Sequence, residues 1–244
     1  MGTGGCRFDS CRACFTVTWA DAMNALALSA LVALAPVPTP HSDAQLYRIL
    51  LLRAAPGSLL EVIALEKHVP GKPFLLRHSQ GDQWDLMAIF PMATDRVTPV
   101  EDARLDTALA ARIAWREEVF VKGPPLPQVA AALGGGEFYH IEMHVALPGR
   151  LADLVREREM ENAFERALAR PEDLIFTRIA GAAWDVVTVG TYHDIKHYAE
   201  SADISEARQD SAARVAGFAS ADAIGPYLRT LIASHHDTLA RAVH

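Results

Sequence analysis

Two segments of this 244-residue chain share one pattern, and this repeat constrains the fold more than any other feature. Gln45–Gly57 and Glu137–Gly149 read QLYRILLLRAAPG and EFYHIEMHVALPG, and each ends in Pro-Gly before a helical stretch. Residues 74–92 and 174–192 match at a constant offset and repeat a glycine followed by Trp-Asp. Two blocks that match in the same order indicate an internal duplication. Each half therefore reads strand, helix, hairpin, helix.

The predicted boundaries follow from these blocks and from the Pro and Gly residues between them. The first module spans residues 45–133, Gly134–Gly136 form a hinge, and the second module spans residues 137–244. Apolar periodicity predicts a helix from Pro99 to about Arg116, a short strand at Val119–Val121, and a helix from Gly149 to about Arg170. A last helix is expected after Pro226, with these residues along one side: Leu228, Leu231, Ile232, His235 and Leu239. On such an apolar face His235 is expected to be a packed core residue.

Residues 1–44 have no counterpart ahead of the second copy, and we expect them to be a leader. The apolar run Ala25–Ala35 has the length of a signal-peptide core and is too short to span a bilayer. Small residues precede Gln45, so cleavage after Ala44 would leave the first repeat strand at the new terminus. Little positive charge precedes the core, and Met23 is an alternative start. The expected location is periplasmic or secreted.

The three cysteines, Cys6, Cys11 and Cys14, all precede this apolar core. Their spacing is similar to that of three ligands in a plant-type iron–sulfur site, but the chain has no fourth cysteine. An extension without a metal role is the favoured interpretation. The remaining chain of about two hundred residues is long enough to bury a core without disulfides.

Charge and hydropathy limit the classes of partner. The formal net charge is −7, and the chain has no block of Lys or Arg that could follow a phosphate backbone, which disfavours nucleic acid. No long apolar span follows the leader, so the mature domain is not expected to be embedded in a membrane. A small-molecule ligand is the expected partner, and a homo-oligomer is left open.

The second copy of the repeat strand carries the main candidate site. His140, Glu142 and His144 alternate along it and therefore share one face. The first copy has Arg48, Leu50 and Leu52 at these positions. A fully polar set of three side chains therefore occurs in the second copy and not in the first. A rise of about 3.3 Å per residue separates the two histidines by about 13 Å, too far for both to bind one metal ion, so at most an adjacent pair could share an ion. The sequence thus predicts no metal and no cofactor, and acid–base chemistry by these three residues; a merely structural polar face is the alternative.

Five further residues are candidate ligand contacts. The apolar stripe of the helix after Gly149 is interrupted, and its projection brings Arg158 and Asn162 to the buried side, unless the helix bends and all its charges are solvated. Trp184, Tyr192 and His197 follow near the second hairpin. Because Trp-Asp recurs in both halves, a structural use of Trp184 in covering the end of the sheet is equally open.

The duplicated strand–helix–hairpin order, together with the YHDIKHYAES passage from Tyr192, resembles the dimeric α/β-barrel superfamily over Gln45 to about Ser201. Its families include antibiotic-biosynthesis-monooxygenase-like, EthD-like and NIPSNAP-like proteins. This resemblance implies an α+β fold in which two ferredoxin-like modules pack their sheets together, and a pocket beside the sheet for a small, often aromatic molecule. Many members work without a cofactor and some bind haem.

Two classes of function remain open at this stage. The chain is either an exported acid–base enzyme or cofactor-independent monooxygenase, or a non-catalytic binding or scaffold domain. A haem-binding variant is a weaker alternative, because the histidines sit in no axial-ligand motif. A shared fold does not transfer a reaction.

Overall fold

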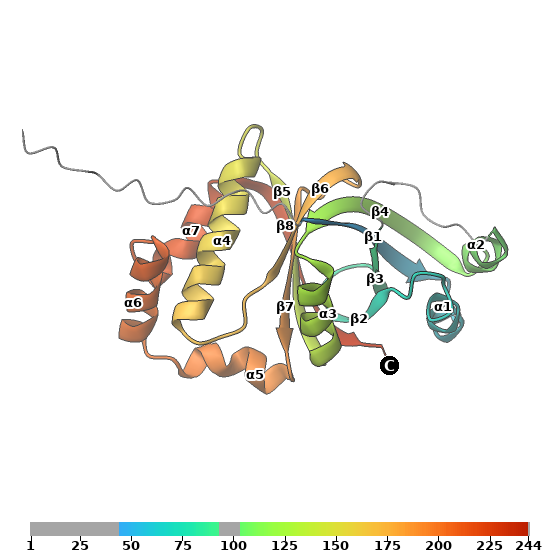
Figure 1. Ribbon diagram of the computed structural model, residues 1–244, viewed down its shortest axis with the longest axis horizontal. Coiled ribbons are helices and arrows are strands. Elements are labelled where there is room, and N and C mark those ends of the chain that lie inside the picture. The colour runs from blue at the N-terminus through green and yellow to red at the C-terminus, as the bar shows by residue number, and fades with distance from the viewer. Residues whose placement is uncertain (1–43, 93–102, 244) are drawn as a thin grey trace, which may run out of the picture. The chain divides into compact units, whose positions relative to one another are not determined.

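The computed structural model describes residues 44–92 and 103–243, which form a closed antiparallel barrel with helices outside it (Figure 1). The strands are β1 (Gln45–Ala54), β2 (Phe74–Gln80), β3 (Leu86–Pro91), β4 (Ile113–Gly123), β5 (Phe138–Ala146), β6 (Leu174–Gly181), β7 (Val186–Tyr192) and β8 (Ile232–Ala242). The helices are α1 (Leu59–Glu66), α2 (Ala103–Ala110), α3 (Leu126–Gly135), α4 (Leu151–Ala167), α5 (Ile195–Ala199), α6 (Glu206–Ala216) and α7 (Ile224–Arg229). Short 3₁₀ turns lie at Glu200–Asp203 and Ala221–Ala223.

The barrel consists of two ferredoxin-like modules with the same strand order. Around the barrel the strands run β1-β3-β2-β8-β5-β7-β6-β4, so the first module reads 4-1-3-2 and the second reads 8-5-7-6. The modules join where β2 pairs with β8 and where β4 pairs with β6. The predicted α+β fold of two tandem modules is confirmed.

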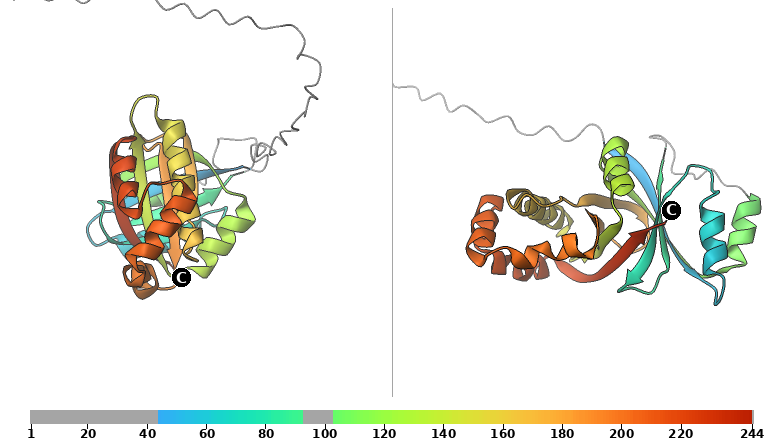
Figure 2. Two further views of the ribbon diagram at one scale, coloured as in Figure 1. Left: turned by 90° about the vertical axis from the view of Figure 1, so that its left-hand side faces the viewer. Right: turned by 90° about the horizontal axis from the view of Figure 1, so that it is seen from below.

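Alternation along the strands fills the barrel interior with apolar side chains. On β5, Tyr139, Ile141 and Met143 point inward and are at most 1% exposed. Their matched residues on β1, Tyr47, Ile49 and Leu51, join the same core. The opposite face of each module is covered by helices, α1 and α2 on one side of the barrel and α4 and α7 on the other, with α6 packed against α4 (Figure 2). The polar face of β5 therefore lies under α4.

The Trp-Asp repeat has a structural use in both modules. The backbone N–H of Asp85 donates to Leu52 O and its carboxylate accepts from Ala54 N, each at 2.8 Å. Asp185 does the same with His144 O at 2.8 Å and Ala146 N at 2.9 Å. Each aspartate thus fixes the end of the first strand of its module. Trp84 is buried in the barrel core and Trp184 packs partly buried against it.

Glycine is required where each hairpin meets the other module. Gly81 has φ +126°, and a Cβ atom there would lie 2.3 Å from Asp237 O on β8. Gly181 has φ +98°, and its Cβ would lie 2.4 Å from Glu118 O on β4. Both junctions depend on the same close backbone approach, which only a residue without a side chain allows.

The helix predictions are wrong for two segments, each of which contains the fourth strand of its module. The helix expected to reach Arg116 ends at Ala110, and Ile113 begins β4, which is much longer than the predicted strand. The helix expected after Pro226 ends at Arg229, and β8 follows. Pairing with two neighbouring strands overrides the helical periodicity of these segments, because each module needs a fourth strand to close the barrel.

The other predicted helices and both hairpins are present with ends shifted by a few residues. Gly134 and Gly135 form the last turn of α3 and Gly136 follows it, so the proposed hinge role of this triplet stays a prediction. The predicted leader up to Asp43, including the cysteines, lies outside the described residues. Among the residues that the structure describes, none of the helices has the length and apolarity to cross a membrane.

Candidate functional site

The outer face of β5 brings polar residues of three strands together. Glu142 is the register partner of Thr188 on β7 and of Asp237 on β8. Because directly opposed residues of antiparallel strands point to the same side, these three side chains form a row across the sheet. His144 is likewise paired with His235, and their rings stack with centroids 5.9 Å apart.

A pocket of about 430 Å³ opens beside this row. His140, Glu142 and Asp237 lie on one wall, and the Tyr198 ring packs against the His140 ring at 5.3 Å between centroids. The remaining lining comes from Gln80, Gly81, Thr238 and Leu239. The pocket thus combines two carboxyl groups, an imidazole and an aromatic surface at the junction of both modules.

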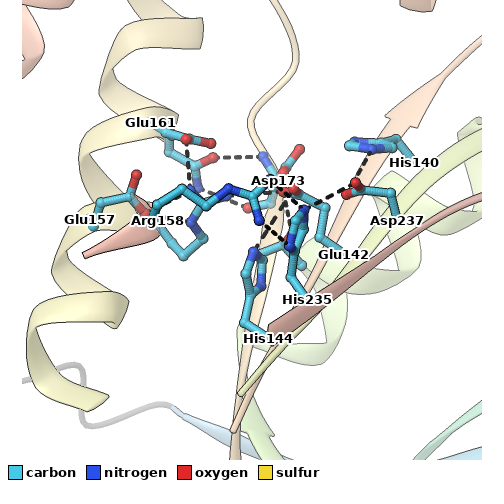
Figure 3. A network of polar contacts seen from close by, with 12 residues as sticks. His140, Glu142, His144, Glu157, Arg158, Glu161, Asp173, His235 and Asp237 are labelled. Atoms are coloured by element: carbon cyan, nitrogen blue, oxygen red, sulfur yellow. Dashed lines mark hydrogen bonds and ion pairs between the residues drawn. The ribbon is translucent and has the colours of Figure 1, made fainter. Parts of the chain in front are cut away.

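Arg158 of α4 anchors Glu142 from above the sheet. The Arg158 side chain is 2% exposed, and its Nη1 donates to Glu142 Oε2 at 3.0 Å. Its Nη2 lies 2.6 Å from Glu157 Oε2 and 2.7 Å from Glu161 Oε1 (Figure 3). Arg158 is therefore buried as projected from the helix pattern, and three carboxyl groups surround its guanidinium. The second apolar stripe of α4, around Met160 and Phe164, packs instead with residues of α6, which explains the interruption.

Burial controls the protonation of this network. It raises the pKa of Glu142, although the nearby Arg158 opposes the shift, and a side-chain hydrogen bond with Asp237 raises it further. Burial also raises the pKa of Glu161 to about 9. For His144, burial and the charge of Arg158 lower the pKa to about 3, so the imidazole is neutral at pH 7. The site can therefore hold protonated carboxyl groups beside neutral imidazole.

The structure divides the predicted site residues into those at the pocket and those elsewhere. His140 and Glu142 line the pocket, with Arg158 behind Glu142. His144 is 0% exposed. Its ring nitrogens have no hydrogen-bond partner among the described residues, apart from a weak contact with the Val186 backbone. It lies deeper than the pocket wall.

The other candidate contacts lie away from this pocket. Asn162 holds the backbone of Asp173, donating to its O at 2.9 Å and accepting from its N at 2.8 Å. Trp184 contacts the ring of His236 at 4.8 Å between centroids. Tyr192 supports Tyr198 from behind, with ring centroids 5.2 Å apart.

His197, the last of the candidate contacts, stacks on the ring of His193 with centroids 5.1 Å apart. It also meets the ring of Tyr192 edge-on at 5.6 Å. His197 lies within α5 and is partly exposed. His197 is therefore not among the residues that line the pocket of His140 and Glu142.

Sequence reasoning missed Asp237, Tyr198 and His235 as site residues. Asp237 and His235 were assigned to a helix, although β8 places both on the face of Glu142 and His144. The predicted duplication contains a signal that identifies them. A module that repeats the first half needs a strand matching β4, and the segment after the last helices is the place for it.

The comparisons with known proteins support the fold alone. No family model matches the chain, and no curated protein is detectably similar in sequence. One similar solved structure is an anthrone oxidase-like protein, with 11% identity and a TM-score of 0.51 over 84% of this chain and 93% of the other. A candidate monooxygenase from Fusobacterium nucleatum has 9% identity and a TM-score of 0.52 over 83% of this chain and 94% of its own. A candidate monooxygenase from Lactobacillus acidophilus has 7% identity and a TM-score of 0.50 over 81% of this chain and 93% of its own. The chain shares its α+β barrel fold with these three proteins.

Proposed function

We propose that the second module binds a small, oxygen-bearing aromatic molecule and moves a proton on it. The observation that carries this proposal is the convergence of His140, Glu142 and Asp237 on one open pocket beside the Tyr198 ring. An acid and a base held within reach of the same ligand are the usual equipment of proton transfer. The first module has Leu50 at the position of Glu142, so we assign the site to the second module alone.

The two carboxyl groups and the imidazole suit different tasks. Glu142, whose pKa burial raises, is suited to donate a hydrogen bond to a carbonyl or phenol oxygen. His140 is partly exposed, and its Nε2 lies 3.8 Å from Asp237 Oδ1, which orients the ring to take a proton from the ligand. Removal of an acidic C–H or O–H proton leaves an electron-rich anion. With O₂ as the second substrate, such an anion can be oxidised without a protein-bound cofactor.

The fold neighbours favour this chemistry over other small-molecule reactions. One is described as anthrone oxidase-like and two as candidate monooxygenases. An anthrone is a fused aromatic ketone with an acidic C–H, which fits a pocket with an aromatic wall and an acid–base cluster. We therefore propose cofactor-independent oxygenation of such a compound as the specific reaction.

Oxygen uptake with anthrone as the substrate tests the reaction. We expect His140→Gln and Asp237→Asn to lower the rate at least about tenfold, the lower range for loss of a general acid or base. Glu118→Gln, which changes the matched carboxylate of the first module, should leave the rate within about twofold. Saturable anthrone binding with no uptake above the uncatalysed rate would instead identify a non-catalytic binding domain. An intense haem absorption band in the purified chain would favour the haem-binding alternative.

Export is a separate proposal, supported by the apolar run Ala25–Ala35 and the small residues before Gln45. We propose that the mature chain begins at or near Gln45 and is periplasmic or secreted. N-terminal sequencing of the protein from a bacterial host checks it. A cytosolic product that keeps Met1 or Met23 would refute export.

A further inference from the structure

The three polar residues at the pocket lie almost close enough together to share a metal ion. One ligand atom from each of His140, Glu142 and Asp237 can be chosen so that all lie within 4.8 Å of one another. Ligands that share an ion at bond lengths of about 2.1 Å lie about 3 to 4 Å apart. The Asp237 side chain is 53% exposed, and a small rotation that keeps its contact with His235 would close the difference.

In the carboxylates of Glu142 and Asp237, one oxygen contacts a neighbouring side chain and the other faces the cluster of three polar residues. Glu142 Oε2 accepts from Arg158 Nη1 at 3.0 Å, and Thr188 Oγ1 lies 3.4 Å away. Asp237 Oδ2 lies 3.2 Å from His235 Nε2, whereas Oδ1 is the oxygen nearer to His140. Partners of this kind fix the ligands of metal sites in place.

Charge around Arg158 also favours a cation. Glu142, Glu157 and Glu161 all contact this one guanidinium. Buried carboxyl groups that outnumber their cations must hold protons or gain another positive charge. A divalent ion beside Glu142 would supply that charge where Asp237 adds a further carboxylate.

His144 is an independent observation that points to the same place. It is 0% exposed, makes no hydrogen bond of normal geometry with a described residue, and turns Nε2 toward Glu142 Oε1 at 3.9 Å. An apolar side chain would cost less at this depth. The neutral imidazole lies behind the oxygen that would face the ion.

The first module provides a natural contrast. Arg48 and Glu118, which occupy the positions of His140 and Asp237, form an ion pair with each other, and Leu50 replaces Glu142. At the matching place in the first module, the Arg48 guanidinium supplies the positive charge and one carboxylate is absent. Among the described residues, only the second module has an imidazole and two carboxylates in this arrangement.

We propose that His140 Nε2, Glu142 Oε1 and Asp237 Oδ1 hold a divalent first-row metal ion, such as Mn²⁺ or Zn²⁺. Imidazole and carboxylate together suit such ions. The remaining coordination positions face the pocket, so the ion would bind an oxygen of the ligand there. The inference rests on the pocket and the ligand of the proposed function, but it changes the task of two residues, since Glu142 Oε1 and His140 Nε2 would bind the ion instead of exchanging protons with the ligand. The separation of His140 from His144 is no obstacle, because the third ligand comes from β8.

Titration of the metal-free full chain tests the site. Binding of Mn²⁺ is followed by the electron paramagnetic resonance of the free ion, and binding of Zn²⁺ by calorimetry. We expect one ion per chain and at least roughly tenfold weaker binding in Asp237→Asn, Glu142→Gln and His140→Gln, with Glu118→Gln within about twofold of the parent. Asp237→Asn is the decisive variant because its side chain is half exposed, and an unchanged urea midpoint shows that it folds. Absence of binding of both ions at about 1 mM, or equal affinity in Asp237→Asn and Glu118→Gln, overturns the proposal.

Anthrone binding and oxygen uptake, repeated in excess chelator, separate this inference from the proposed function. No ion binding together with unchanged anthrone turnover in chelator refutes the metal site and leaves the acid–base function standing. Ion binding that depends on Asp237, with no anthrone binding in the loaded chain, supports the metal site and refutes the proposed function.

Discussion

Glu142 on β5 and Asp237 on β8 are register partners, and their carboxyl groups lie side by side on the sheet face covered by α4. The negative charge of Asp237 raises the pKa of Glu142, because neighbouring carboxylates repel each other. The pair therefore behaves as one titrating unit in which each residue changes the acidity of the other.

Replacing Asp237 should lower the pKa of Glu142. Asp237→Asn removes a neighbouring negative charge and the carboxyl partner that raise the pKa of Glu142. A carbon-13 NMR titration of the Glu142 carboxyl measures the change. Glu118→Gln serves as the control and should leave this titration unaltered. An identical Glu142 curve in Asp237→Asn would show that the two groups do not interact.

Arg158 should be among the most costly side chains to remove. Arg158→Met leaves three carboxyl groups without the guanidinium that they surround. Breaking a buried ion pair by removing one partner costs about 3 to 5 kcal/mol of unfolding free energy. Urea unfolding measures the loss, with Arg166→Met as the matched control on the same helix, because Arg166 is 63% exposed. Equal midpoints for the two variants would contradict the structural role of Arg158.

Asp173 should make the chain less stable as pH rises toward neutrality. Burial raises the pKa of Asp173 to about 7, so the folded chain keeps a proton that the unfolded chain releases near pH 4. This contribution to stability is full below about pH 4 and is lost as pH rises through about 7. Asp173→Asn should remove up to about 4 kcal/mol of that decline. Urea unfolding at pH 4 to 8 checks this, with Asp153→Asn as an α4 control; parallel profiles for both variants would refute it.

The glycine at the module junction should not tolerate a side chain. Gly81→Ala places Cβ against Asp237 O at a φ of +126°, so we expect a loss of about 2 kcal/mol or more in unfolding free energy. Gly134→Ala, in α3 with nothing within 4 Å of its Cβ, should be neutral or stabilising by up to about 1 kcal/mol. Thermal or urea unfolding ranks the pair. A Gly81→Ala chain as stable as Gly134→Ala would mean that β2 and β8 do not approach as described.

The sequence predicts those parts of the fold whose signals are local. Hairpins bounded by glycine and the helix before Pro171 are identified from residues within a short window. Strand β8 is not, because its segment IASHHDTLARA spaces apolar residues in a way that also fits a helix, and its strand form depends on pairing with β5 and β2.

The residues of the candidate site also divide into those that a local sequence pattern identifies and those that depend on distant contacts. His140, Glu142 and the inward turn of Arg158 could be identified because alternation and helix periodicity act along one element. Asp237 could not, since it approaches Glu142 only across a strand pair formed by residues far apart in the chain. Tyr198 reaches the His140 ring from a short helix whose direction no local pattern specifies.

Covalent continuity between the modules has an evolutionary consequence. In a barrel assembled from two identical chains, every substitution appears twice, so a polar residue gained for chemistry also burdens the other sheet. Here β2 pairs with β8, and β4 with β6, within one chain. A mutation therefore changes only one of the two modules. Leu50 and Leu52 can serve packing while Glu142 and His144 occupy the matching places, and each half can specialise at no cost to the other.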